Sequence, residues 1–137
     1  MRQIKQIIIH CSATPEGRNI GATTIRGWHK ERGFSDIGYH YVIRLDGTIE
    51  EGRPIEQIGA HCQGHNRNSI GICYIGGLSQ ERQPKDTRNV AQYRAMTQLL
   101  EQLHEQFPEA TIHGHSEFAN KACPCFNVNE YLRSIKL

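Results

Sequence analysis

A chain of 137 residues with 37% hydrophobic and 22% charged side chains has the composition of one ordinary globular domain, so we treat residues 1–137 as a single domain. Its formal net charge of +2, without a basic run, argues against a nucleic-acid-binding protein, and no apolar run approaches the roughly 18 residues of a membrane span. We therefore expect neither nucleic acid nor a membrane as a partner.

The N-terminal segment and the cysteines indicate where the protein is made. Residues 1–10 lack both the long apolar core and the small-residue cleavage site of a signal peptide. The five cysteines are odd in number, and none belongs to a C-x-x-C pair. We expect synthesis in a reducing cytoplasm without a signal peptide, where cysteine is a metal ligand or a core residue.

The first predicted strand and helix occupy the N-terminal third of the chain. Ile4 to Cys11 is a predicted strand buried on both faces, because Ile7 to Ile9 leave no polar side. His10 stands where this strand ends. Thr23 is a plausible N-cap for a helix that continues through Arg32, and Gly33 is its C-terminal stop.

A hairpin and a further buried strand are predicted in the middle of the chain. Gly38 to Leu45 is a strand, and Asp46-Gly47 is the favoured two-residue turn of a hairpin. Thr48 to Glu50 should therefore pair back antiparallel. Ser69 to Ile75 is another buried strand, which Gly76-Gly77 closes.

The longest predicted helix begins at Asn89, with Gln92 at the third position as in a capping box, and ends before Pro108. Its apolar stripe consists of Val90, Tyr93, Met96, Leu100, Leu103 and Phe107. Thr111 to Gly114 is a short strand, Ser116 to Phe126 is a loop, and a final short helix opens at Asn127. Strands alternate with helices, and the hairpin adds antiparallel pairing. We predict an α/β domain with a mixed central sheet of about five strands, flanked by about three helices.

A group of metal-ligating side chains lies at the two ends of the chain. His10 ends the first strand, and the segment from Thr111 to Phe126 contains His113, His115, Cys123 and Cys125. Imidazole and thiolate are the preferred ligands of zinc. The pattern alone does not choose between the two histidines or between the two cysteines, and the His-x7-Cys spacing is not one of the tight structural-zinc spacings.

A closed structural zinc site is an alternative, because His10, His115, Cys123 and Cys125 can supply four ligands. A catalytic zinc site has three protein ligands and one open position. Several reactive side chains near the ligands favour the catalytic alternative, since a structural site has no need of them: Tyr39, His40, Glu117 and Lys121.

The chain resembles a known family, the zinc-dependent N-acetylmuramoyl-L-alanine amidases of the type 2 class, which includes the peptidoglycan recognition proteins. The matching stretches are Ile8–Thr14, Ile25–Lys30, Gly38–Tyr41, Asp46–Thr48, Asn68–Cys73 and Lys121–Pro124. They follow one another from about residue 7 to residue 126, so the resemblance covers nearly the whole chain.

The resemblance implies one Zn²⁺ per chain with His10, His115 and Cys123 as ligands, at a cleft on one side of the sheet. It also implies that Tyr39 and Lys121 are the catalytic pair beside the metal. A lysine ammonium so close to the ion can stabilise the developing oxyanion, and the tyrosine hydroxyl can donate to the oxyanion or the attacking water.

Four further residues are candidates for contact with substrate: His40, His61, Asn66 and Glu117. A satisfied core histidine is an equal alternative for His40, and a solvated polar loop is an equal alternative for His61 and Asn66. The general base also stays open among Tyr39, His40 and Glu117.

The function that the resemblance implies is peptidoglycan hydrolysis. Zinc-activated water would cleave the amide bond between N-acetylmuramic acid and the L-alanine of the stem peptide, in a phage or prophage endolysin that acts on the cell wall after release. The alternatives are a non-catalytic peptidoglycan-binding module, or a regulator of a phage RNA polymerase, by analogy with one phage member of the family. A glycosidase is disfavoured because the motifs offer no carboxylate pair. We expect a monomer that binds peptidoglycan.

Overall fold

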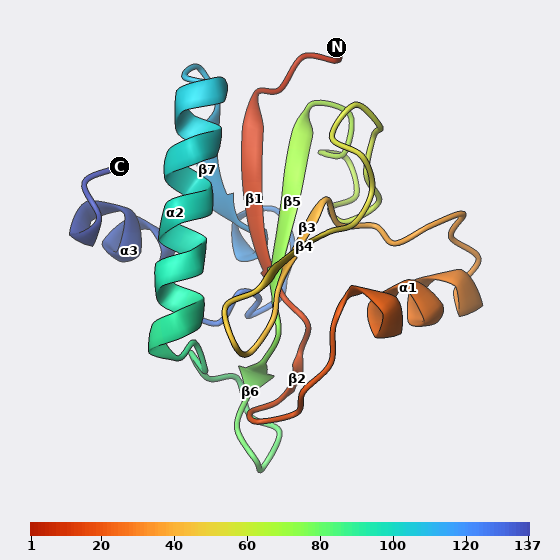
Figure 1. The fold of residues 1–137 in the computed structure, drawn as a ribbon, viewed down its shortest axis with the longest axis vertical. Coiled ribbons are helices and arrows are strands. Elements are labelled where there is room, and N and C mark those ends of the chain that lie inside the picture. Colours follow the sequence, from red (N-terminus) through yellow and green to blue (C-terminus); the bar gives the residue numbers. More distant parts are fainter.

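The computed structural model describes residues 1–137, which form a five-stranded sheet in the order β4-β3-β5-β1-β7 (Figure 1). These strands are β1 (Gln6–Cys11), β3 (Tyr41–Ile43), β4 (Ile49–Glu51), β5 (Ser69–Tyr74) and β7 (Thr111–Gly114). β1 runs parallel to both β5 and β7, and β3 runs parallel to β5. β4 is antiparallel to β3, across the hairpin predicted at Asp46-Gly47. The predicted mixed sheet is confirmed.

Helices cover both faces of this sheet (Figure 1). They are α1 (Ala22–Glu31), α2 (Val90–Gln106) and α3 (Val128–Ser134), and a 3-10 turn η1 (His115–Glu117) follows β7. A small second sheet pairs β2 (Thr14–Pro15) with β6 (Gly77–Leu78). None of the helices combines the length and the apolar character needed to cross a membrane. The predicted number of three α-helices is confirmed.

The central strand β1 is covered on both faces, as its unbroken isoleucine run predicts. Ile7, Ile8 and Ile9 are 0% exposed. Ile7 and Ile9 belong to the core beneath α2 and α3, whereas Ile8 has the opposite orientation because strand side chains alternate. His10 thus lies near the carboxyl end of a strand that is paired on both sides.

The two faces of the sheet have cores of unequal size. The core that contains α2 and α3 has 16 buried residues, including Met96, Leu100 and Tyr131. The core that contains α1 has 7, including Ile25, Val42 and Cys73. Burial of apolar surface is the main favourable term in folding, so α1 has much less of this stabilisation than α2.

The start of α1 differs from the predicted N-cap at Thr23. The helix begins at Ala22, and Gly21 in the N-cap position has no side chain with which to cap it. The Glu50 carboxylate from β4 accepts a hydrogen bond from the Ala22 amide at 2.9 Å instead. A negative charge at a helix N-terminus is favourable because the first amides point at it.

The capping box predicted for α2 is present. The Asn89 side chain accepts from the Gln92 amide at 2.8 Å, and the Gln92 side chain accepts from the Asn89 amide at 3.2 Å. The predicted apolar stripe is partly wrong, because Val90 is 65% and Tyr93 is 37% exposed. The buried face is turned toward Gln92, whose side-chain amide donates to the Ile75 carbonyl at 2.9 Å inside the core.

Candidate active site

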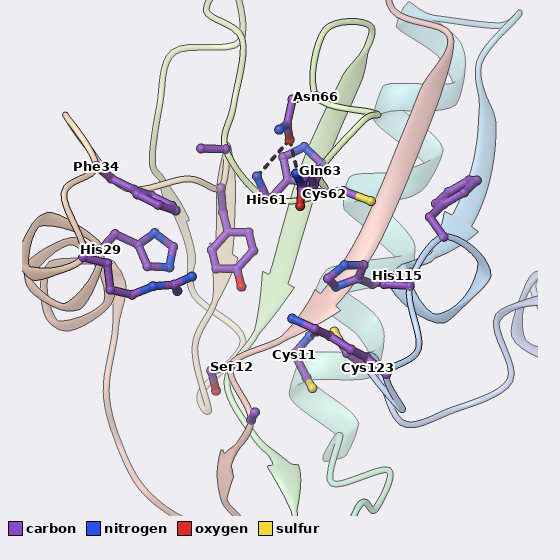
Figure 2. Close-up of a pocket in the computed structure, with 17 residues that line it drawn as sticks. Cys11, Ser12, His29, Phe34, His61, Cys62, Gln63, Asn66, His115 and Cys123 are labelled. Atoms are coloured by element: carbon purple, nitrogen blue, oxygen red, sulfur yellow. Dashed lines mark hydrogen bonds between the residues drawn. The ribbon is translucent and has the colours of Figure 1, made fainter.

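A cavity of about 640 Å³ opens at the carboxyl end of β1 (Figure 2). One wall comes from α1 and the chain after it, where His29 and Phe34 lie. The facing wall comes from the segment after β7, which carries His115 and Cys123. The predicted cleft on one side of the sheet is therefore present, and residues far apart in the sequence meet in it.

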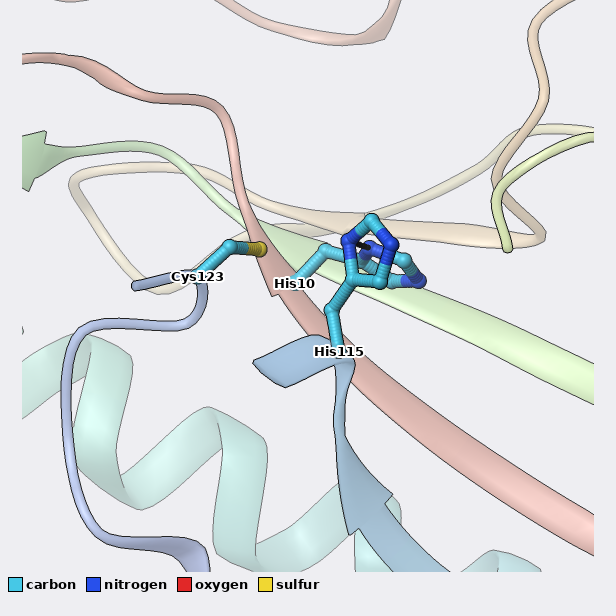
Figure 3. A group of neighbouring side chains, drawn as sticks. All are labelled: His10, His115 and Cys123. Atoms are coloured by element: carbon cyan, nitrogen blue, oxygen red, sulfur yellow. Dashed lines mark hydrogen bonds between the residues drawn. The ribbon is translucent and has the colours of Figure 1, made fainter. Parts of the chain in front are cut away.

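His10, His115 and Cys123 form one compact group of metal-ligating atoms (Figure 3). Their ligand atoms all lie within 4.8 Å of one another. The Nδ1 atoms of the two histidines are 3.1 Å apart. Two nitrogens bound to a tetrahedral zinc at its usual bond length would be about 3.3 Å apart. The three donors thus fit a zinc ion in both chemical type and spacing.

The sheet register explains why these donors meet. β1 lies parallel beside β7 with Ile9 opposite Gly114, so His10 and His115 each come next at the same edge. The Cys11 amide of β1 donates to the Cys123 sulfur at 3.2 Å and holds that loop against the strand.

The other two candidate donors, His113 and Cys125, lie outside this group. The His113 ring faces away, with its nitrogens 2.6 Å from Thr111 Oγ1 and 3.0 Å from Glu117 Oε1. The Cys125 sulfur lies 3.9 Å from the Cys11 sulfur. A closed four-ligand site with Cys125 is therefore absent from the structure.

The surroundings of the group favour neutral imidazoles. Burial lowers the pKa of His10 well below its ordinary value, and the nearby His61, His115 and Lys121 add to this effect. The pKa of His115 is lowered too, by burial and then by Lys121. A histidine binds a metal ion through an unprotonated ring nitrogen, so low pKa values keep both rings in the neutral form that can bind.

Tyr39 and Lys121 line the same cavity as the metal-ligating group. The Tyr39 ring packs against the His10 ring at a centroid distance of 5.1 Å. Burial raises the pKa of Tyr39 well above its ordinary value, so its hydroxyl keeps its proton. Lys121 is exposed and projects from the loop that ends in Cys123. The structure thus brings together all five residues that the family resemblance implied.

His61 and Asn66 also line the cavity, from the loop between β4 and β5. The Asn66 side-chain oxygen accepts from the backbone amides of His61 and Cys62, both at 2.9 Å, so Asn66 shapes the loop itself. His61 Nδ1 lies 2.8 Å from His10 Nε2. No sequence pattern indicated this contact, because it joins residues 51 positions apart.

His40 and Glu117 are not among the residues that line the cavity, and their contact with substrate stays a prediction. His40 is 1% exposed; its Nδ1 accepts from the Gly71 amide at 3.0 Å, and its Nε2 lies 2.8 Å from the Gln57 carbonyl. Glu117 accepts from the Gly114 amide at 2.9 Å and contacts His113. Their polar atoms have hydrogen-bond partners within the fold.

The family model described as N-acetylmuramoyl-L-alanine amidase matches residues 1–126. The chain belongs to the N-acetylmuramoyl-L-alanine amidase family. The predicted family and the predicted amidase activity are thereby confirmed.

Phage proteins are among the relatives of this amidase. It is 41% identical over 125 residues to the endolysin of Escherichia phage T7, with 91% of this chain and 83% of the relative covered. The endolysin of Enterobacteria phage K11 is 38% identical over 136 residues, which cover 99% of this chain and 90% of the relative.

Solved structures show the same fold. The N-acetylmuramoyl-L-alanine amidase LysC from Clostridium intestinale has a TM-score of 0.85 and 27% identity, over 99% of this amidase and 87% of that chain. Drosophila PGRP-LB has a TM-score of 0.77 and 27% identity, over 90% of this amidase and 76% of that chain. The chain is thus a peptidoglycan amidase with the architecture shared by endolysins and peptidoglycan recognition proteins.

Proposed function

We propose that this amidase is zinc-dependent, with His10, His115 and Cys123 as the ligands, and that it acts as an endolysin on the cell wall. The observation that carries the proposal is the group of three donors beside a cavity. Three protein ligands leave one coordination position for water or substrate, as in catalytic zinc sites. When bound, zinc supplies Lewis acidity toward the scissile carbonyl and makes water a stronger nucleophile.

Tyr39 and Lys121 supply the stabilisation of the charge that develops during the reaction. The Lys121 ammonium lies on the loop that carries Cys123 and stabilises the negative charge that develops on the carbonyl oxygen. The Tyr39 hydroxyl retains its proton, because burial raises its pKa, and so acts as a hydrogen-bond donor. The Tyr39 ring already packs against His10 before substrate arrives, and such preorganisation makes electrostatic stabilisation effective.

The charge of the cavity suits an anionic substrate. Arg32 and Lys121 are the charged residues among those that line it, and no aspartate or glutamate is present there. The Arg32 guanidinium lies 5.1 Å from the centroid of the Phe34 ring and has no acidic partner. Peptidoglycan stem peptides carry free carboxylates, so these two positive charges attract them.

The rival functions explain these features less well. A binding module needs neither a complete donor group nor a tyrosine and a lysine beside it. Nothing in the cavity or the charge distribution favours a role as a polymerase regulator. Endolysin relatives cover nearly the full length of the chain, and a monomeric lytic enzyme released to the cell wall is the simplest role for it.

The test combines metal content with product analysis. Purified wild-type protein should contain one zinc per chain and release L-alanine amino groups from cell wall, without new reducing sugar ends. The Cys123→Ser variant should lose both the zinc and the activity. Cys125→Ser is the matched control, because this nearby thiol lies outside the donor group.

Two results would contradict the proposal. Full zinc content and full activity in Cys123→Ser would exclude this cysteine as a ligand. The appearance of reducing sugar ends with the wild-type protein would indicate a glycosidase instead.

A further inference from the structure

Three polar side chains form a hydrogen-bonded row that begins at His10. His10 Nε2 lies 2.8 Å from His61 Nδ1, and His61 Nε2 lies 3.1 Å from Ser69 Oγ. His10 is 1% exposed and Ser69, the first residue of β5, is 0% exposed. The row therefore leads from the metal-ligating group through His61, which lines the cavity, to Ser69 in the interior.

The donor and acceptor roles in this row follow from one condition. The Nδ1 of His10 faces the Nδ1 of His115, so it is the nitrogen that must offer a lone pair to a metal ion. The proton of His10 then sits on Nε2 and is donated to Nδ1 of His61. His61 must in turn carry its own proton on Nε2, which donates to Ser69 Oγ. One arrangement of protons satisfies all three residues.

The fold holds the His61 ring in this place. A side-chain carbon at Gly71 would lie 2.6 Å from the ring, and one at Gly59 would lie 2.9 Å from it. The ring itself therefore requires the glycine at position 71, whereas a side-chain carbon at Gly59 would lie even closer to the Gly38 carbonyl oxygen, at 2.7 Å, and to His40 Cε1, at 2.8 Å. The Asn66 side chain fixes the backbone at His61 from the other side. A ring that only touched substrate would not need such close confinement.

We propose that His61, supported by Ser69, is a positioning residue that selects the tautomer and the ring orientation of the ligand His10. This inference rests on the proposed zinc function. It gives His61 a different role from the substrate contact expected from the sequence. Partners of this kind orient metal-bound histidines, and their loss typically weakens metal binding about 10- to 100-fold.

The first measurement is the zinc dissociation constant of the full chain without substrate, by competition with a chromophoric chelator. His61→Phe keeps a ring but removes the acceptor, and should weaken zinc binding about 10- to 100-fold. His61→Asn places an amide oxygen near the position of Nδ1 and should recover most of the affinity. Ser69→Ala should weaken binding in the same direction by a smaller factor.

The second measurement is the visible spectrum of the cobalt-substituted protein, which reports ligand geometry independently of activity. His61→Phe should change the cobalt bands, and His61→Asn should restore them toward those of the wild type. His104→Gln is the control, since this exposed histidine on α2 lies outside the row and should leave both measurements unchanged.

The outcomes separate this inference from the proposed function. If His61→Phe has the same zinc affinity and cobalt bands as the wild type and only its KM is higher, His61 contacts substrate and the positioning role is overturned. If His61→Phe does not fold, unchanged zinc affinity and unchanged cobalt bands in Ser69→Ala overturn it equally. A wild-type protein that binds no zinc would instead refute the proposed function.

Discussion

Histidine serves several purposes among the eight such residues of this chain, and its surroundings decide which. His10 and His115 face each other with lone pairs available for a metal ion. His29 and His40 each accept a hydrogen bond from a backbone amide, at Gly38 and Gly71 respectively, and have structural roles. Identical side chains thus divide into the proposed metal ligands and residues that bond within the fold, according to the partners of their nitrogens.

The proposed catalytic roles of Tyr39 and Lys121 can be tested apart from the metal. Tyr39→Phe and Lys121→Ala should each keep one zinc per chain and lose turnover by about 100- to 1000-fold, because each removes one donor to the developing charge. Metal analysis and amide release from cell wall measure the two effects. Lys5→Ala, a change of an exposed lysine outside the cavity, is the control. Full activity in both variants would refute the assignment.

The buried His40 predicts how stability depends on pH. Burial lowers the pKa of His40 to about 4 from an ordinary value near 6.5. Between these values the unfolded chain binds a proton that the folded chain excludes, so stability falls as pH falls through this window. The loss from His40 alone amounts to about 2 kcal/mol at pH 5 relative to pH 7.5.

Urea unfolding of zinc-free protein at pH 7.5 and pH 5.0 measures this dependence, because removal of zinc excludes metal loss as a cause. His40→Gln can still accept from the Gly71 amide and donate to Gln57, but it does not titrate. Its stability should therefore drop by about 2 kcal/mol less than that of the wild type. An equal drop in both proteins would show that His40 does not carry the effect.

At the scale of elements, the predictions succeeded where the signal is local. The capping box of α2 lies within four residues, Asn89 to Gln92, and both of its hydrogen bonds form. The start of α1 depends on Glu50, 28 residues away from Ala22, and no local pattern contains that information. The exposed Val90 and Tyr93 have a similar explanation, because a tertiary hydrogen bond of Gln92 turns the helix face.

The same distinction applies to the active site. Strand ends and donor types indicated a zinc group, and the resemblance to the amidase family chose His115 and Cys123 among the donors. The contact of His61 with His10 was beyond prediction, because ring orientation is set by neighbours such as Gly71 and Asn66. The burial of His40 agrees with the core histidine that the sequence left as an equal alternative. Packing between distant segments determines these details.

The N-cap of α2 has a predictable energetic role. Asn89→Ala removes the side-chain acceptor for the Gln92 amide and should lower stability by about 1 kcal/mol, or Tm by roughly 3–5 °C. Thermal unfolding followed by circular dichroism measures the change. Glu105→Ala, at an exposed position in the last turns of α2, should shift Tm far less. Equal shifts in the two variants would contradict the role of the cap.

At the scale of the whole molecule, the unequal cores predict unequal local stability. The face with α1 has 7 buried core residues against 16 on the face with α2 and α3. Segments with fewer buried apolar contacts open at lower free energy. The amides of α1 should therefore exchange with solvent through partial openings, whereas those of α2 should exchange only on global unfolding.

Native-state hydrogen exchange at increasing urea concentrations measures both helices in one experiment. Amides in β1 supply the reference for global unfolding, since that strand is paired on both sides. Equal opening free energies for α1 and α2 would show that the molecule unfolds as one cooperative unit, and the unequal cores would then have no effect on local stability.

The two walls of the cavity come from separate stretches of the chain. The metal-ligating wall belongs to β1 and to the segment after β7, while the facing wall, with Arg32 and Phe34, belongs to α1 and the turn that follows it. Residues 30–36 include none of the donors, so their replacement leaves the group of His10, His115 and Cys123 in place. Substitutions in one segment can therefore change the charge and shape of one wall of the cavity while the donors on the other wall stay the same.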